Sequence, residues 1–452
     1  PMGYSNVGTV EEIGSDVTEF KIGDRVVSNG SHAEMVCVPK NLVAKIPNNV
    51  SDEDAAFTVV SSIALQGIRL INPTIGENIV VMGSTGSIGI QSLDVISKHN
   101  SHKVVGLTCH SNANLLFEQT KKYSPNFVAI DIIDSSHNLF NLCEKNNIEL
   151  ITGNDASSNI PFSNLDLAIN AIVGTSGLRP TIELIKNGVD VALSNKESLV
   201  LGGHIIMPLA NKKNVNIIPV DSEHSAIFQC LNGENQKELK KIILTGSGGP
   251  FLKKPIHEFD TITPNEALKH PNWDMGAKIS IDSATMMNKA LELVEALWLF
   301  NIKLDKIQIT IHPQSIVHSM VEFVDGSYKA HLGLPDMKVP IQYALTFPER
   351  KDSSVGSVDF DNLNLDFKKP DLERYPILAL VEELINLGGN RVAVMSMAND
   401  HIVQKFLDQK ISFNEIFSLI KEVIDKFASD DLPSLEELFI LDKNIQLYLD
   451  PN

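Results

Sequence analysis

The stretch IVVMGSTGSIGIQSLDVISK, residues 79–98, decides how the largest part of this chain folds. Ile79–Met82 is an apolar run typical of a buried strand, and a helical pattern follows the glycine loop. In that loop, Gly83, Gly86 and Gly89 permit a tight turn that brings the backbone close to a pyrophosphate at the start of the helix. The spacing GxxGxxG is weaker evidence than GxGxxG, so a glycine-rich turn without a ligand stays as the alternative.

Short apolar runs recur after this loop, with helical patterns between them. They are Val104–Leu107, Phe127–Ile130, Leu167–Ile169, Val191–Leu193 and Ile217–Val220. This alternation predicts βαβ units and a parallel sheet, which is an α/β fold of the Rossmann-like kind.

From about residue 242 the pattern changes. Strand-like runs at Ile242–Leu244, Lys306–Ile311, His318–Phe323 and Ser327–His331 predict a second, partly antiparallel sheet in an α+β domain. The tail from about residue 370 predicts a helical domain with amphipathic helices at Pro376–Leu387, Arg391–Gln409, Phe413–Phe427 and Ser434–Leu449.

The first 47 residues have a different character. Their β-prone runs are Val7–Val10, Arg25–Val27 and Met35–Val38, and Ser51 then caps a helix expected to run through about Asn72.

Composition limits the possible partners. The chain has 452 residues and a formal net charge of −18, and its basic residues form no run. Such a chain should repel nucleic acid and anionic membrane, so we expect neither as a partner. It has four widely spaced cysteines and no apolar run long enough to span a bilayer, and its start lacks the pattern of a secretory leader. We therefore expect reduced thiols and a cytoplasmic location.

The second predicted strand indicates which dinucleotide would bind. An NAD site usually carries an acid about 20 residues after the glycine loop, where it holds the ribose 2′-hydroxyl. Here the strand ends in Thr108-Cys-His-Ser-Asn112, without an acid. Hydrogen-bond donors in that place suit a 2′-phosphate, so NADP(H) is favoured over NAD(H).

Three carboxylates predict a metal site. Asp221 and Glu223 stand at the end of a strand, where alternate residues share a face unless the chain bends there. Ser283 is expected to cap a helix that presents Asn288, Lys289 and Glu292 on one side. Two acids with Glu292 make a hard oxygen site that selects Mg²⁺ or Mn²⁺ over zinc, whereas each acid taken alone would be a solvated surface charge.

Three further segments point to a ligand. Gly246-Ser-Gly-Gly-Pro250 offers backbone amides and a hydroxyl to a phosphate, with a plain turn as the alternative. His270-Pro-Asn-Trp-Asp-Met-Gly276 has the composition of a lid, with a core-anchored tryptophan as the alternative. Lys196 follows a strand at the edge where open α/β sheets bind ligands. His312 and His318 are interpreted as structural.

Together these motifs resemble those of the 1-deoxy-D-xylulose 5-phosphate reductoisomerases, from about Ile79 to the C-terminus. The matching words are GSTGSIG at 83–89, NKESLV at 195–200, PVDSEHSAIFQ at 219–229, LTGSGGPF at 244–251, HPNWDMGAKISIDSATMMNKALE at 270–292 and IHPQSIVHSM at 311–320. The resemblance implies an enzyme that rearranges and reduces 1-deoxy-D-xylulose 5-phosphate with NADPH and a divalent metal, giving 2-C-methyl-D-erythritol 4-phosphate for isoprenoid precursor biosynthesis. It also implies a homodimer and no partner beyond this small sugar phosphate and the cofactors.

The resemblance implies a role for each matching residue. The cofactor would contact Thr85, Gly86, Ser87, Ile88, His110, Ser111, Asn112, Asn195, Glu197 and Gly276. The metal would be held by Asp221, Glu223 and Glu292. The substrate would meet Lys196, Ser222, Glu223, Ser247, His270, Trp273, Ser283, Asn288, Lys289 and Glu292, with Lys196 and Glu223 catalytic and Trp273 as the lid. Members of the family often have a basic residue where Ser111 stands, which bears on the strength of NADPH selectivity.

Residues 1–77 resemble another family, the medium-chain dehydrogenases/reductases. Gly3–Gly14, Phe20–Val27 and Ile63–Gly67 match the later part of their barrel-like catalytic domain and the helix before their nucleotide-binding fold. We interpret the segment as a truncated graft, from a gene fusion or a join in the assembled sequence; a regulatory or dimer-forming appendage is the alternative.

The domain boundaries expected from these resemblances are 1–78, 79–221 for the NADPH domain, 222–360 for the catalytic domain and 361–452 for the helical domain. Two other functions stay open. One is a medium-chain alcohol or quinone reductase activity of the N-terminal segment, and the other is a non-catalytic fusion.

Overall fold

The computed structural model describes residues 5–59, 61–62, 76–99, 102–273 and 275–450. The chain divides into two compact units, Pro1–Ile75 and Gly76–Asn452. Among the described residues, every helix is too short or too polar to traverse a lipid bilayer.

The smaller unit is an antiparallel sheet in the order β1-β2-β3. Its elements are β1 (Asn6–Thr9), β2 (Arg25–Ser28), β3 (Val43–Lys45) and α1 (Asp52–Ala55). The buried apolar side chains described in this unit form a small core of Val27, Ile46 and Ala55.

The structure differs from two predictions for this unit, those of a strand and a helix. Met35–Val38 was predicted as a strand and is irregular, because β3 takes the free edge of β2 and the run itself ends at Pro39. The helix expected from Ser51 to Asn72 is seen at its beginning, where the Ser51 side chain caps α1. A turn at residues 56–57 interrupts it, residues 58–59 and 61–62 are helical again, and residues 60 and 63–72 lie outside the described residues.

The larger unit contains a seven-stranded parallel sheet in the order β10-β9-β8-β4-β5-β6-β7. Its strands are β4 (Glu77–Met82), β5 (His102–Cys109), β6 (Phe127–Ile130), β7 (Glu149–Thr152), β8 (Leu167–Asn170), β9 (Asp190–Leu193) and β10 (Ile217–Pro219). The parallel sheet is confirmed, although edge strand β7, which is short and half polar, was not predicted. Strand order reverses between β4 and β8, and this switch point is where open α/β sheets bind ligands.

Helices cover both faces of this sheet. Alternate residues of β4 show this, since Val80 and Met82 pack in one core and Ile79 and Val81 in the other. The helices that connect the strands and follow the last one are α3 (Ser87–His99), α4 (Ala113–Tyr123), α5 (Leu139–Asn146), α6 (Leu178–Lys186), α7 (Lys196–Lys213) and α8 (Ser222–Leu231).

The glycine loop connects β4 to α3 at the switch point. Gly83 has φ of 71°, and a Cβ there would lie 2.7 Å from the carbonyl oxygen of Ala171. A Cβ at Gly89 would lie 2.3 Å from the carbonyl oxygen of Gly83. Only glycine allows this close approach of loop, helix and neighbouring strand end, and it places the N-terminus of α3 at the carboxyl edge of the sheet.

A second sheet has the order β12-β11-β13-β14, in which β11 and β12 are parallel and the other pairs antiparallel. Its strands are β11 (Leu239–Gly246), β12 (Ile307–Ile311), β13 (Val317–Phe323) and β14 (Tyr328–Leu332). The helices of this region are α9 (Pro264–Ala267), α10 (Ala277–Thr285), α11 (Met287–Leu299) and α12 (Lys338–Thr346). The predicted mixed sheet is therefore confirmed.

The prediction that Ser283 caps a helix was wrong. Ser283 lies in the last turn of α10, where its carbonyl oxygen accepts a hydrogen bond from the amide of Met286. Met286 has φ of 62°, a left-handed conformation that ends α10 and redirects the chain into α11.

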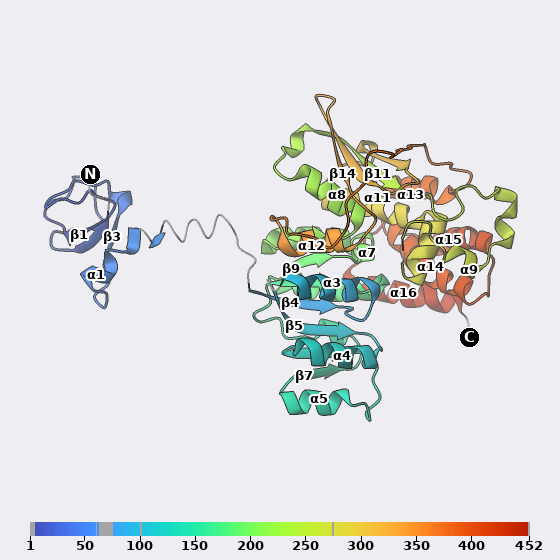
Figure 1. The fold of residues 1–452 in the computed structure, drawn as a ribbon, viewed down its shortest axis with the longest axis horizontal. Coiled ribbons are helices and arrows are strands. Elements are labelled where there is room, and N and C mark those ends of the chain that lie inside the picture. Colours follow the sequence, from blue (N-terminus) through green and yellow to red (C-terminus); the bar gives the residue numbers. More distant parts are fainter. Residues whose placement is uncertain (1–4, 60, 63–75, 100–101, 274, 451–452) are drawn as a thin grey trace. The chain divides into compact units, whose positions relative to one another are not determined.

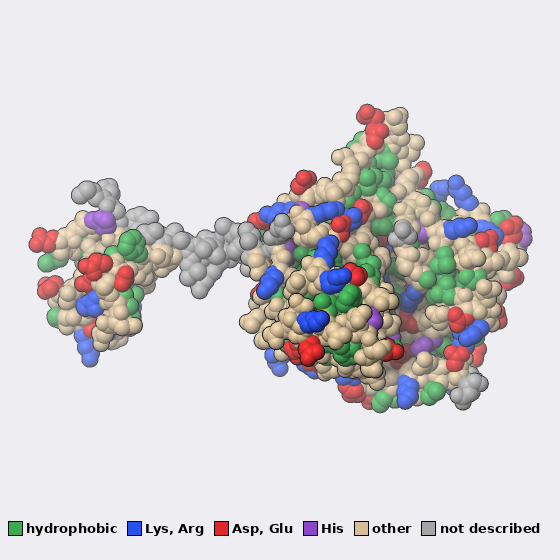
Figure 2. Space-filling model, turned by 60° about the horizontal axis from the view of Figure 1, so that its bottom comes forward, with side chains coloured by type: hydrophobic (Ala, Val, Ile, Leu, Met, Phe, Trp, Pro, Cys, Tyr) green, Lys and Arg blue, Asp and Glu red, His purple; other side chains and the backbone are tan. Residues whose placement is uncertain are grey.

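The C-terminal region is helical, as expected, with α13 (Pro376–Leu387), α14 (Arg391–Leu407), α15 (Phe413–Phe427) and α16 (Leu435–Leu449). In Figure 1 these orange and red helices gather at one side of the larger unit. Helix α14 packs against α7 and α10, so it reaches the elements that carry the site. On the face shown in Figure 2, acidic and basic side chains are interspersed over the larger unit.

Candidate functional site

A cavity of ≈ 480 Å³ opens at the carboxyl ends of the parallel strands and extends to the second sheet. Most of the site residues predicted from the sequence line it. They are Gly86, Ser87, Ile88, Asn195, Lys196, Glu197, Asp221, Ser222, Glu223, Ser247, His270, Trp273, Gly276, Ser283, Asn288, Lys289 and Glu292. Segments far apart in sequence therefore meet around one cavity.

Four predicted residues do not line this cavity. Thr85 precedes Gly86 in the glycine loop, and His110, Ser111 and Asn112 lie on the surface where β5 turns into α4. The Asn112 side chain caps α4 by accepting from the amide of Leu115. These residues form a separate polar surface beside the glycine loop.

The tertiary structure brings an acid to that surface. Asp131 follows β6, and its Oδ2 lies 2.9 Å from Nδ1 of His110. The end of β5 carries no acid, as the sequence shows, but the neighbouring strand β6 is followed by one. In this position Asp131 orients the imidazole of His110.

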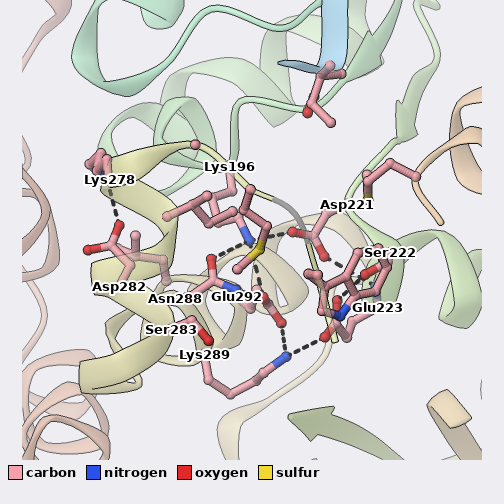
Figure 3. A pocket seen from close by; sticks show the side chains of 18 of the residues that line it. Lys196, Asp221, Ser222, Glu223, Lys278, Asp282, Ser283, Asn288, Lys289 and Glu292 are labelled. Carbon is pink, nitrogen blue, oxygen red and sulfur yellow. Dashed lines mark hydrogen bonds and ion pairs between the residues drawn. The ribbon is translucent and has the colours of Figure 1, made fainter. Parts of the chain in front are cut away.

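Lys196 lies on the cavity floor, in the first turn of α7. Its ammonium group contacts Asp221 and donates to Glu292 Oε1 at 3.1 Å; it also donates to Asn288 Oδ1 at 2.8 Å (Figure 3). Burial by itself lowers the pKa of Lys196, but Asp221 and Glu292 raise it well above its ordinary value. Lys196 is therefore a charged hydrogen-bond donor.

Lys289 connects the remaining carboxylates. Its Nζ donates to Glu223 Oε1 at 2.8 Å and contacts Glu292. The other oxygen of Glu223 accepts from the Ser222 hydroxyl at 2.6 Å. Two ammonium groups thus hold three carboxylates, from the start of α8 and from α11, in one buried network.

Asp221 and Glu223 are arranged differently from the expectation of alternate strand residues. Strand β10 ends at Pro219, and Asp221 caps α8 by accepting from the amide of Glu223 at 3.2 Å. Asp221-Ser-Glu223 is itself a helix-starting sequence, so the chain bends where the strand was expected to continue. Both carboxylates consequently stand at a helix N-terminus, which favours negative charge.

The residues present fit a divalent cation. Asp221, His224 and Glu292 offer ligand atoms that all lie within 4.8 Å of one another, and Glu223 is linked to Glu292 through Lys289. Burial, together with the charges of Asp221 and Glu223, raises the pKa of Glu292. A divalent cation would relieve this repulsion between carboxylates, and three carboxylates suit Mg²⁺ or Mn²⁺.

His224 contacts two of the proposed metal-binding residues. Its Nδ1 lies 3.1 Å from Asp221 Oδ1, and its Nε2 lies 2.9 Å from the carbonyl oxygen of Glu292. Burial opposes protonation, but Glu295 and Asp221 raise the pKa of His224 to about 9. Through these two contacts His224 joins α8 to α11.

The predicted phosphate loop and lid meet at one end of the cavity. Nε2 of His270 lies 3.0 Å from the hydroxyl of Ser247. Nδ1 of His270 accepts from the amides of Asn272 and Trp273, so the ring is neutral with its proton on Nε2. In agreement, burial lowers the pKa of His270 to about 4.

Trp273 lines the cavity and contacts a histidine of the second sheet. Its ring meets that of His318 edge to face, with centroids 6.0 Å apart. The side-chain amide of Asn272 donates to the carbonyl oxygen of Pro313 and to the hydroxyl of Ser315, which ties the loop to the β12–β13 connection. This placement fits a covering loop that rests on its neighbours.

Sequence reasoning missed several residues that line the cavity, among them Gln91, Ser194, Lys278, Asp282, Ser315 and Met337. Lys278 and Asp282 are four residues apart on α10, a spacing that could have been noticed. His312, interpreted as structural, has backbone partners at both ring nitrogens, and it lines the cavity as well.

Comparison with known families divides the chain in two. Residues 79–203 match the model named 1-deoxy-D-xylulose 5-phosphate reductoisomerase, and residues 217–300 and 332–448 match two C-terminal domain models of the same family. Residues 1–48 match the alcohol dehydrogenase GroES-like domain, in agreement with the resemblance of the N-terminal segment.

Whole proteins match the larger unit. A 1-deoxy-D-xylulose 5-phosphate reductoisomerase of Chloroherpeton thalassium is 47% identical over 376 residues, which is 82% of this chain and 97% of that protein. One from Thermoanaerobacter pseudethanolicus is 44% identical over 373 residues, with the same shares covered.

Solved structures of reductoisomerases also match most of this chain. The enzyme from Zymomonas mobilis in complex with NADPH has a TM-score of 0.76 at 40% identity, covering 82% of this chain and 97% of that one. A reductoisomerase in complex with NADPH, fosmidomycin and magnesium has a TM-score of 0.76 at 36% identity, with the same shares covered. The chain belongs to the 1-deoxy-D-xylulose 5-phosphate reductoisomerase family.

Proposed function

We propose that the cavity of the larger unit is the site at which 1-deoxy-D-xylulose 5-phosphate is rearranged and reduced to 2-C-methyl-D-erythritol 4-phosphate. The activity is that of the family, and it makes a precursor for isoprenoid biosynthesis. The observation that carries the assignment of residues is the buried network of Lys196, Lys289 and three carboxylates on the floor of a cavity that reaches the glycine loop.

Two cofactors supply the chemistry. NADPH provides the hydride, and Mn²⁺ or Mg²⁺ provides a Lewis acid that stabilises negative charge on the sugar oxygens. We assign the metal to Asp221, Glu223 and Glu292. We assign NADPH to the loop Thr85–Ile88, to His110, Ser111 and Asn112, and to Asn195, Glu197 and Gly276.

The chain's own residues bind and orient the sugar phosphate. Lys196 and Lys289 are charged donors at the cavity floor and would hold oxygens of the substrate. Ser247 and the Nε2–H of His270 form a neutral donor pair for the phosphate, with Ser283 and Asn288 beside it. Two ammonium groups stand against three carboxylates on the cavity floor. An anionic substrate would therefore need the positive charge of the bound divalent metal beside Lys196 and Lys289, in a chain of net charge −18.

Ser222 and Trp273 complete the proposed site. Ser222 fixes one oxygen of Glu223, so this carboxylate faces the cavity in one orientation. Trp273 would cover the bound sugar and exclude water from the aldehyde intermediate before hydride transfer.

The deciding assay follows NADPH oxidation in the presence of 1-deoxy-D-xylulose 5-phosphate, with and without Mn²⁺. We expect turnover that depends on both the metal and the sugar phosphate. A folded protein without metal-dependent turnover would refute the proposal. Reduction of simple alcohols or quinones, the alternative for the N-terminal segment, has no comparable support, since its family model matches only residues 1–48.

We also infer a homodimer that forms through β14. Among the described strands, β14 lies at the edge of its sheet and pairs only with β13, and its Tyr328 and Leu332 are 57% and 37% exposed. An open, partly apolar edge can pair with the same edge of a second copy. Sedimentation equilibrium tests the inference, and a monomer at micromolar concentration would contradict it.

Two last inferences concern the domain boundaries and the cellular location. We place the domain boundaries in the larger unit near residues 221 and 360, and limited proteolysis at these positions would test them. We infer a cytoplasmic location, where free thiols such as the buried Cys109, Cys143 and Cys230 stay reduced, and cell fractionation would test it.

A further inference from the structure

A second charged cluster lies beside the proposed metal site, centred on Lys278. Its Nζ lies 3.0 Å from Glu197 Oε1, 2.8 Å from Asp282 Oδ2 and 3.0 Å from Asp400 Oδ1. These three carboxylates come from α7, α10 and α14. One ammonium group therefore joins the helix that opens the proposed cofactor site, the helix after the lid loop and a helix of the C-terminal region.

The cluster is secluded and carries more negative than positive groups. The side chains of Lys278, Glu197, Asp282 and Asp400 are 19%, 10%, 3% and 17% exposed. Asn399 on α14 also donates to the second oxygen of Asp282, at 2.7 Å. Burial raises the pKa of Asp400 to about 6, whereas the pKa of Lys278 stays well above its ordinary value against burial, because of Asp282 and Asp400.

Two of the carboxylates paired with Lys278, those of Glu197 and Asp400, contact the proposed NADPH site. Glu197 lines the cavity, and its Oε2 accepts from Asn195 Nδ2 at 3.3 Å. The same amide of Asn195 donates to the carbonyl oxygens of Ile172 and Gly174, which follow β8. Asp400 packs on this turn, since a Cβ at Gly174 would lie 2.9 Å from its carboxylate.

Lys278 and its third partner, Asp282, lie on the helix that follows the lid loop. Lys278 is the second residue of α10, which begins directly after the loop His270–Gly276. Figure 3 shows Lys278 and Asp282 on one side of α10, with Asn288, Lys289 and Glu292 beyond it. The ammonium group thus fixes the end of the lid loop to the turn that faces the cofactor.

We propose that Lys278 is a positioning residue for NADPH: it holds Glu197 and the first turn of α7 in place by tying them to Asp282 and Asp400. The inference rests on the assignment of Glu197 to the cofactor site. Without the ammonium group, Glu197 and Asp400 would face each other as unpaired, secluded carboxylates. Glu197 would turn away, release Asn195 and loosen the turn after β8.

The test is direct binding of NADPH by the full chain, measured by isothermal titration calorimetry, beside KM and kcat. Lys278→Met removes the charge and keeps the length of the side chain. We expect it to weaken NADPH binding by about tenfold, the factor for one lost charge-assisted hydrogen bond. Lys278→Arg should largely restore binding, and Lys443→Met, at an exposed position on α16, is the matched control.

A double-mutant cycle separates positioning from general damage. If Lys278 acts through Glu197, then Glu197→Gln combined with Lys278→Met should bind NADPH no more weakly than the weaker single variant. Additive losses, or a folded Lys278→Met that binds NADPH as the unsubstituted chain does, would overturn the inference.

Two other experimental outcomes also lead to a decision. If Lys278→Met lacks the circular dichroism spectrum of the folded chain, Asp400→Asn decides, because it removes one of the carboxylates paired with Lys278 and leaves Lys278 charged; unchanged NADPH binding in that folded variant overturns the inference. If the unsubstituted chain does not bind NADPH, the proposed function itself fails. NADPH binding that is insensitive to Lys278 refutes only the positioning role.

Discussion

Replacing Glu292 by glutamine tests the metal site most sharply, because Glu292 is fully buried and its two carboxylate oxygens face two different ammonium groups. A carboxamide has a single acceptor oxygen, so either Lys196 or Lys289 loses its bond to this side chain. Each lysine keeps another carboxylate, Asp221 or Glu223. The change removes one hydrogen bond between charged groups, about 1.5–3 kcal/mol. It also relieves the repulsion from Asp221 and Glu223 that raises the pKa of Glu292, so the net loss of unfolding free energy without metal should be smaller than this range.

Metal binding should add a second difference in unfolding free energy between the variant and the unsubstituted chain. A metal that binds only the folded chain stabilises it by about 2.7 kcal/mol at a hundredfold excess over its dissociation constant. Glu292→Gln removes one of the three proposed ligand charges and should lose most of this gain, together with turnover. Urea unfolding with and without Mn²⁺ measures both differences, and Glu382→Gln, an exposed change on α13, is the control.

One result would refute the reasoning. If Mn²⁺ stabilises Glu292→Gln as much as it stabilises the unsubstituted chain, Glu292 does not hold the metal. If the metal-free variant is as stable as the unsubstituted chain, the bonds to Lys196 and Lys289 only offset the repulsion from Asp221 and Glu223, and they give the metal-free fold no net stability.

Four other outcomes are expected. Deleting residues 1–75 should leave kcat/KM within about twofold, since these residues form their own compact unit, and should improve solubility; a folded but inactive product would show that the segment has a role. Ser111→Asp should raise KM for NADPH by about tenfold and spare KM for NADH, because a carboxylate repels the 2′-phosphate; equal effects on both would remove Ser111 from that site. Burial lowers the pKa of His270 to about 4, below its unfolded value near 6.5, so its contribution to stability is present above pH 6.5 and is lost as the pH falls towards 4; His270→Gln should lose less stability over this range in urea unfolding, and an identical loss would contradict the assignment. Leu332→Lys on β14 should shift the proposed dimer to monomer in sedimentation equilibrium, and an intact dimer would exclude this edge.

Local patterns predicted the fold well where they had a physical cause within a short stretch. The apolar runs of the parallel sheet are buried on both faces, and the glycine loop lies between a strand and a helix as expected. The helices Pro376–Leu387 and Phe413–Phe427 have the predicted bounds, because their amphipathic period and their flanking residues are visible in sequence.

Predictions were wrong where a turn competed with a periodic pattern. Ser283 looked like a helix cap, but Met286 adopts the left-handed conformation and sets the break three residues later. Asp221 and Glu223 looked like strand neighbours, but the cap of α8 begins at Asp221. At Asp221 the helix-starting signal was present in the sequence and outweighed the strand pattern. At Met286 the left-handed conformation is uncommon for a residue other than glycine, so the local pattern gave no sign of it.

The sequence by itself determined the fold class, the separate character of the first residues, and the residue types needed for a dinucleotide, a phosphate and a hard cation. Only the tertiary structure decided which charges meet. Lys196 and Glu292 are 96 residues apart along the chain and share a hydrogen bond, while Asp400 reaches Lys278 from a C-terminal helix. No local pattern encodes such pairs, because they are set by the packing of α7, α10, α11 and α14, and burial in that packing gives each pairing its strength.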